Sequence, residues 1–94
     1  MKAMKASAVI NLQDIPNIGP AMIEDFKKLE IYTPADLKKQ DAFALYQKLC
    51  ALTHTRHDPC VLDTFIAAVQ FMNGAPAHPW WHYTAERKRN YPTI

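Results

Sequence analysis

The sequence predicts an all-α protein, a small single-domain bundle of about five helices. Apolar residues recur at helical spacing through most of the chain, and prolines with capping residues divide it into short segments. The alternating β-branched patterns typical of strands are scarce. A length of 94 residues suits one domain with a small core, and the 49% hydrophobic and 21% charged shares are those of a folded soluble chain.

The first predicted element is a short helix that ends near residue 15. Ser7 is placed to cap its start, and Val9 and Leu12 lie three residues apart on one face. Pro16 then stops the helix because proline cannot continue it, and Asn17 tolerates the positive φ that a tight turn needs.

A second helix is predicted to start at Pro20, where the missing N–H of proline costs nothing. Gly19 precedes it and also tolerates a positive φ. The two helices and their turn form a predicted hairpin at about residues 8–30. Its second helix has an apolar stripe made of Met22, Ile23, Phe26 and Leu29.

Three further helices are predicted from the caps at their starts. Thr33, with an acid three residues later, has the pattern of a capping box. Asp41 and Asp58 stand before the next two helices, and Gly74 ends the last. The predicted ranges are 34–39, 42–53 and 59–73, followed by an aromatic and basic tail at 79–94.

The start of the second helix is the main candidate site. A helix that begins after a glycine presents free backbone N–H groups and the positive end of its dipole, and no side chain keeps an anion away. A nucleic-acid phosphate is a natural ligand, and such contacts carry no sequence information. The predicted backbone donors are Gly19, Ala21 and Met22, and the turn geometry comes from Pro16, Asn17 and Ile18.

These residues carry a resemblance to a known motif. The run Leu12-x-x-Ile15-Pro16-Asn17-Ile18-Gly19-Pro20, followed by Phe26, Leu29, Ile31, Thr33 and Leu37, resembles the helix-hairpin-helix motif of many DNA repair proteins. The resemblance implies that loop amides bind phosphates and that loop carbonyls can hold a monovalent cation. No other cofactor is expected.

A longer resemblance spans roughly residues 12–83. The segments Leu49-Cys50, Asp58-Pro59-Cys60-Val61-Leu62-Asp63 and Trp80-Trp81 are similar to a small bacterial family labelled pathogenicity-locus or mitomycin-resistance. The resemblance implies a helix-hairpin-helix protein without an established activity.

The chain departs from the hairpin motif at three positions. Asn17 replaces the first loop glycine, Ala21 stands where a basic residue is common, and Ile23 stands where a small alanine is common. The nearest cations are Lys27 and Lys28, about two turns into the helix.

The expected function is sequence-independent binding of a nucleic-acid backbone, that of double-stranded DNA above all, with a link to DNA damage or repair implied only by the resemblance. The alternatives are a protein-interaction or homodimerising module and a purely structural turn. A net charge of +2 and a pI of 8.6 do not by themselves point to DNA. Electrostatic support is expected from Lys27, Lys28, Arg56, Arg87, Lys88 and Arg89.

The aromatic pair Trp80-Trp81 leaves two interpretations open. Beside the tail cations it suits stacking on bases. It also suits covering the open edge of a small core, since aromatic side chains hide a large area.

Cys50, His54, His57 and Cys60 are side chains of metal-ligating types within eleven residues, but their spacing does not match structural zinc patterns. We therefore expect no metal. Cys60 near a helix start is either a buried small side chain or a reactive thiol. No set of nucleophile, base and orienting group stands out, so no enzyme is predicted.

A cytoplasmic location is expected. No apolar run approaches the ~20 residues of a membrane span, so no membrane partner is predicted. The start of the chain has lysines but no apolar stretch of a secretory signal behind them, and the two cysteines are expected to be reduced.

Overall fold

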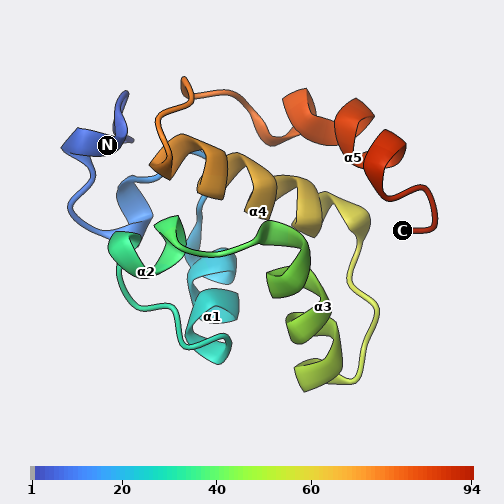
Figure 1. Ribbon diagram of the computed structural model, residues 1–94. Coiled ribbons are helices and arrows are strands. Elements are labelled where there is room, and N and C mark those ends of the chain that lie inside the picture. The colour runs from blue at the N-terminus through green and yellow to red at the C-terminus, as the bar shows by residue number, and fades with distance from the viewer. Residues whose placement is uncertain (1) are drawn as a thin grey trace.

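The centre of the fold is its longest helix, α4, and the other helices are arranged around it. Figure 1 shows this computed structural model, which describes residues 2–94, with α1 and α3 below α4 and α5 above it. The α-helices are α1 (Pro20–Lys28), α2 (Pro34–Lys38), α3 (Ala42–Thr53), α4 (Pro59–Met72) and α5 (Thr84–Asn90). The described residues contain no strand, so the all-α prediction is confirmed.

One hydrophobic core joins these helices. The rings of Phe26 on α1 and Phe65 on α4 stack with centroids 5.4 Å apart. The loops before and after α1 also contribute fully buried side chains, so the connections are held as firmly as the helices. The other large, fully buried apolar side chains are Ile15, Ile18, Ile31, Leu37, Leu49, Leu62 and Phe71.

The helices predicted at 34–39, 42–53 and 59–73 each agree with α2, α3 and α4 to within one residue at either end. Their starts carry the expected signals. The Thr33 side chain accepts the N–H of Asp36 at 3.2 Å in a capping box, and the Asp58 carboxylate accepts the N–H of Cys60 at 2.8 Å. Gly74 ends α4 with φ of 106°.

The first predicted helix is wrong. Residues 8–15 contain no continuous helix, and two single 3-10 turns, η1 (Ala6–Ala8) and η2 (Leu12–Asp14), take its place. The Asp14 carboxylate accepts the N–H groups of Ile10 at 3.1 Å and Asn11 at 2.9 Å, which holds Asn11 extended and starts η2 there. Ser7 lies in η1, exposed, and caps nothing.

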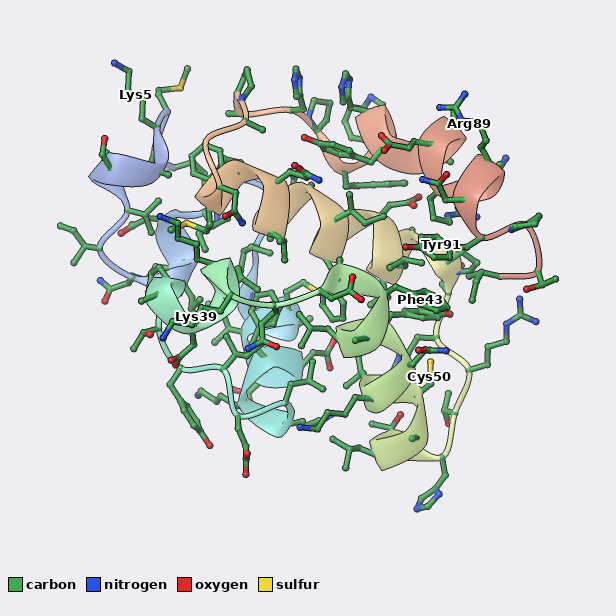
Figure 2. All side chains as sticks on the ribbon, in the orientation of Figure 1. Lys5, Lys39, Phe43, Cys50, Arg89 and Tyr91 are labelled. Carbon is green, nitrogen blue, oxygen red and sulfur yellow. The ribbon has the colours of Figure 1, made fainter. Side chains whose placement is uncertain are left out.

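The C-terminal segment is helical, whereas only an aromatic and basic tail was predicted. A 3-10 turn, η3 (Trp80–Tyr83), leads directly into α5, and Tyr83 is buried. After α5 the ring of Tyr91 stacks on Phe43 of α3, with centroids 4.2 Å apart, as Figure 2 shows. The end of the chain is therefore tied to the bundle by packing that residues 79–94 alone do not reveal.

Candidate nucleic-acid interface

The loop that leads into α1 is anchored by its own apolar side chains. Ile15 and Ile18 are fully buried, and the Ile18 N–H donates to the Ile15 carbonyl at 3.2 Å to close the turn. Asn17 between them has φ of 73°, the left-handed conformation that its place in the sequence predicts. We call residues 15–19 the Gly19 loop. Its backbone is positioned by burial of these isoleucines in the core.

Asn17 has a second role that the sequence did not indicate. Its side-chain amide donates to the His78 carbonyl at 2.8 Å, and its side-chain oxygen accepts the Trp80 N–H at 3.3 Å. The side chain thus fastens the segment before η3 to the Gly19 loop, across more than sixty residues of chain. A glycine at position 17 would satisfy the backbone equally well. The presence of an asparagine there was the one signal in the sequence that the side chain makes a contact of its own.

The start of α1 is open. Gly19 has φ of −110° and ψ of −175°, an extended conformation that any residue adopts, and a Cβ added there would meet nothing within 4 Å. In the part of the chain that the structure describes, no side chain caps this start, and no acid lies in its first turn. Among the described residues, the N–H groups of Ala21 and Met22 have no protein acceptor. These two donors and the positive end of the helix therefore face outward.

A shallow hollow of about 530 Å³ lies over this helix start. Lys2 reaches it from the N-terminal segment, and its ammonium donates to the carbonyls of Gln13, at 2.6 Å, and Ile18. The sequence interpretation missed Lys2, which lies far from the loop along the chain. The hollow is lined by Lys2, Gln13, Ile18, Gly19, Pro20, Ile23 and Glu24.

The predicted cations are spread over the molecule and do not gather at this hollow. Lys27 pairs with Glu24 at 3.2 Å, and Lys28 lies 3.8 Å from Asp25, both on α1 and both exposed. Such surface pairs contribute little to stability and leave the lysines able to change partner. Arg56 approaches the Thr93 carbonyl at 3.5 Å, which places it beside the C-terminus.

Arg87 is a correction to the predicted set. Its side chain is only 8% exposed and forms an ion pair with the fully buried Asp63, with Nε donating to Oδ1 at 2.8 Å and Nη2 to Oδ2 at 3.2 Å. Thr84 donates to the same carboxylate at 2.8 Å. This network joins α5 to α4, so Arg87 is not available to a phosphate. Lys88 and Arg89 remain exposed, and Figure 2 shows Arg89 at the outer edge of the molecule.

The two tryptophans differ in exposure. Trp80 is half-buried, whereas Trp81 is 63% exposed and meets Trp80 edge to face with ring centroids 5.5 Å apart. Of the neighbouring rings, His78 stacks on His82 at 3.8 Å. Asn17 accepts the backbone N–H of Trp80, which holds Trp80 against the Gly19 loop. The exposed indole of Trp81 belongs to the next residue along the chain.

The start of α4 contrasts with that of α1. The Asp58 carboxylate occupies it, and the bond from the Cys60 N–H lowers the pKa of Asp58. Burial, followed by the neighbouring Asp58, raises the pKa of the Cys60 thiol, so the geometry disfavours a reactive thiolate. Both cysteines are free, and across residues 2–94 no three metal-ligating side chains form a cluster.

The fold and the site together describe an all-α single-domain protein whose candidate binding site is an open helix start. The family model described as "Pathogenicity locus" matches residues 5–89, and the chain belongs to this family. It is also 41% identical over 86 residues to the "Mitomycin resistance protein McrB" of Streptomyces lavendulae, covering 92% of this chain and 82% of that protein. No solved structure matches the chain. Within the described residues, no helix is both long and apolar enough to span a membrane.

Proposed function

We propose that this protein binds the backbone of nucleic acid, double-stranded DNA above all, without sequence specificity, through the Gly19 loop and the start of α1. The observation that carries the proposal is the open helix start. Two backbone donors point outward there, and neither the backbone conformation nor the packing requires a glycine. A glycine without a structural reason at such a place suits close approach of a phosphate.

Two features beside the loop and one on α5 support the same ligand. The ammonium of Lys2 places a positive charge beside the open helix start. The exposed ring of Trp81 follows the segment that Asn17 fastens to the loop, where it suits stacking on a base at a frayed or single-stranded site. Lys88 and Arg89 supply exposed charge on α5. The name of the Streptomyces relative refers to resistance to mitomycin, a DNA cross-linking drug, and DNA as the ligand of this chain fits that name.

The deciding experiment is a titration of the protein with duplex and single-stranded DNA at several salt concentrations. Backbone binding weakens steeply with salt, with a log–log slope of about −0.9 for each phosphate neutralised on a duplex. We expect a salt-dependent affinity for the parent and weaker binding for Gly19→Val, which remains folded because its side chain has open space. Absence of salt-dependent binding to any duplex or single strand by the folded parent would rule the proposal out.

A second variant separates the loop from the basic helix. The double substitution Lys88→Ala and Arg89→Ala is expected to reduce the salt slope by up to about two phosphates. Lys38→Ala with Lys39→Ala removes the same charge from exposed positions at the end of α2 and is the matched control. Equal losses in both double variants would indicate a general charge effect and no defined interface on α5.

The rival function is a protein-docking or homodimerising module. It is favoured by the apolar side chains of Met4 and Ile10, 78% and 80% exposed, which line a second hollow of about 490 Å³ near the N-terminus. Sedimentation of the parent over a range of concentrations tests it. Self-association that is lost in Ile10→Ser and indifferent to salt would favour docking over DNA binding.

A further inference from the structure

The Lys2 ammonium makes a contact that the proposed function does not require. It donates to two backbone carbonyls, those of Gln13 and Ile18, which lie on opposite sides of the turn that precedes α1. Neither partner is a carboxylate, so the contact is not an ordinary surface ion pair. One positive charge holds together the two ends of the turn.

The backbone next to Lys2 is itself held in place. The Ala3 N–H donates to the Asp14 carbonyl at 2.8 Å, and Ala3 and Ala6 pack against the core. The N-terminal segment therefore runs beside η2, and in Figure 1 it lies next to the chain that leads into α1. This anchoring lowers the entropy cost of directing a long lysine side chain at the loop.

The chemistry of the contact is that of a cation site. Two carbonyl oxygens that converge on one point repel each other unless a positive charge lies between them. An ammonium has three donors, and two are used here, which leaves a third on a side chain that lines the hollow together with Gly19 and Pro20. Without the ammonium, the same two oxygens would supply part of the coordination shell of a monovalent metal ion, and water would complete it.

We propose that Lys2 is a built-in cation of the Gly19 loop. It holds the Gln13 and Ile18 carbonyls, keeps a fixed positive charge beside the free amides of α1, and makes the loop independent of potassium or sodium ions. Removal of the ammonium converts the loop into one that requires such an ion. Lys2 is thus a positioning residue, and only its effect on DNA affinity rests on the proposed function.

The test compares thermal unfolding in potassium, sodium and choline chloride at one ionic strength, since choline is too large for a site between two carbonyls. The parent is expected to unfold at the same temperature in all three salts. Lys2→Met is expected to unfold several degrees lower in choline and to recover in potassium or sodium. Lys5→Met is the matched control, because Lys5 is exposed on the same segment and Figure 2 shows it at the edge of the molecule.

Two results would overturn the inference: a Lys2→Met variant that unfolds like the parent in choline, or a parent that is itself stabilised by potassium over choline. Should Lys2→Met not fold, nuclear magnetic resonance of the parent decides. Because the Lys2 ammonium donates to carbonyls, its protons are expected to exchange with water more slowly than those of Lys5. Equal exchange rates for the two lysines would contradict the inference.

DNA affinity is measured in the same salts. The parent is expected to bind equally in potassium and choline, and Lys2→Met to bind about fivefold more weakly in choline, as for one charge near a helix start. A parent that binds no DNA in any salt removes the proposed function, whereas the unfolding temperatures still decide the role of Lys2. Cation-independent binding by Lys2→Met at the parent's affinity contradicts a charge contribution from this residue.

Discussion

The starts of α1 and α4 have the same local plan and opposite chemistry. Each helix has proline at its first position and follows a loop that contains a left-handed residue, Asn17 in one and His54 in the other. The residue before the proline is Gly19 at α1 and Asp58 at α4. Asp58 accepts the first free amide of its helix, whereas at α1 the corresponding donors have no acceptor within residues 2–94.

This difference indicates which helix start is available to a ligand. At α4 the protein supplies its own anion, and one turn further Asp63 is paired with Arg87, so both acids of that region have internal partners. At α1 the cation Lys2 donates to the loop carbonyls, and the acid Glu24, which also lines the hollow, is paired with Lys27. The α4 start stabilises the fold, and the α1 start is left for a phosphate in the function we propose.

The largest expected effect concerns the internal pairing at α4. Arg87→Met leaves Asp63 buried without its partner, and we expect a loss of about 3–5 kcal/mol in the free energy of unfolding by urea. Arg89→Met is the control and is expected to change it by about 0.5 kcal/mol or less, since Arg89 is exposed. Similar losses in the two variants would show that the pair does not hold α5 to α4.

Making α1 resemble α4 is the next largest change. Gly19→Asp supplies a carboxylate cap to the free amides and repels phosphate, so DNA affinity is expected to fall about tenfold or more while the fold is retained. Gly19→Asn, a neutral cap of nearly the same size, is the control and is expected to bind better than Gly19→Asp. Undiminished affinity of Gly19→Asp would place DNA binding elsewhere on the protein.

Making α4 resemble α1 has a smaller effect that depends on pH. Because the folded-state pKa of Asp58 is lowered from its ordinary value of 3.8, its stabilisation is present above that value and is lost as pH falls through the folded pKa. Asp58→Ala is expected to be slightly less stable than the parent at neutral pH and equally stable in acid. Thermal unfolding across this range measures the difference, and a constant gap at all pH values would contradict the cap.

The same substitution tests the thiol. Loss of the Asp58 charge is expected to lower the pKa of Cys60 and to speed its alkylation at neutral pH. The rates are compared in a Cys50→Ser background, so that only Cys60 reacts. An unchanged rate would show that Asp58 does not contribute to the raised pKa of Cys60.

The two glycines provide the smallest expected effects. Gly74→Ala is expected to cost about 1 kcal/mol, because its φ of 106° is unfavourable for a side chain. Gly19→Ala is expected to leave stability unchanged or to raise it by up to about 1 kcal/mol, since its conformation suits any residue. Denaturant unfolding of both variants suffices, and a loss at Gly19 as large as that at Gly74 would mean that the fold needs this glycine.

Much of the fold was predictable because its signals are local. The prolines at the first helical positions, the capping box at Thr33 and the glycine after α4 determine where helices start and stop within a few residues of chain. The first helix was predicted wrongly because one local signal, the apolar spacing, was overridden by another. The apolar spacing of residues 9–15 suited a helix, but the Asp14 carboxylate bound the Ile10 and Asn11 amides and set a later start.

The candidate site was predictable in part. The Gly19 loop and its donors were identified from residues 15–22, and the left-handed Asn17 is confirmed. Of the predicted cations, Arg87 was misassigned because a run of three basic residues is typical of a solvent-exposed segment. Only the ion pair with the buried Asp63 shows that Arg87 is not exposed. Lys2 was missed because nothing along the chain connects it with the loop.

The sequence by itself determined the helix starts, the turn at Asn17 and the open amides after Gly19, since each depends on the conformational preferences of a few adjacent residues. The tertiary structure alone decided which charges are free. Arg87 reaches Asp63 across 24 residues, Asn17 reaches His78 across 61, and Lys2 reaches Ile18 across 16. Such contacts depend on how the core brings distant backbone segments together, and the spacing of residues along the chain does not indicate which segments will meet.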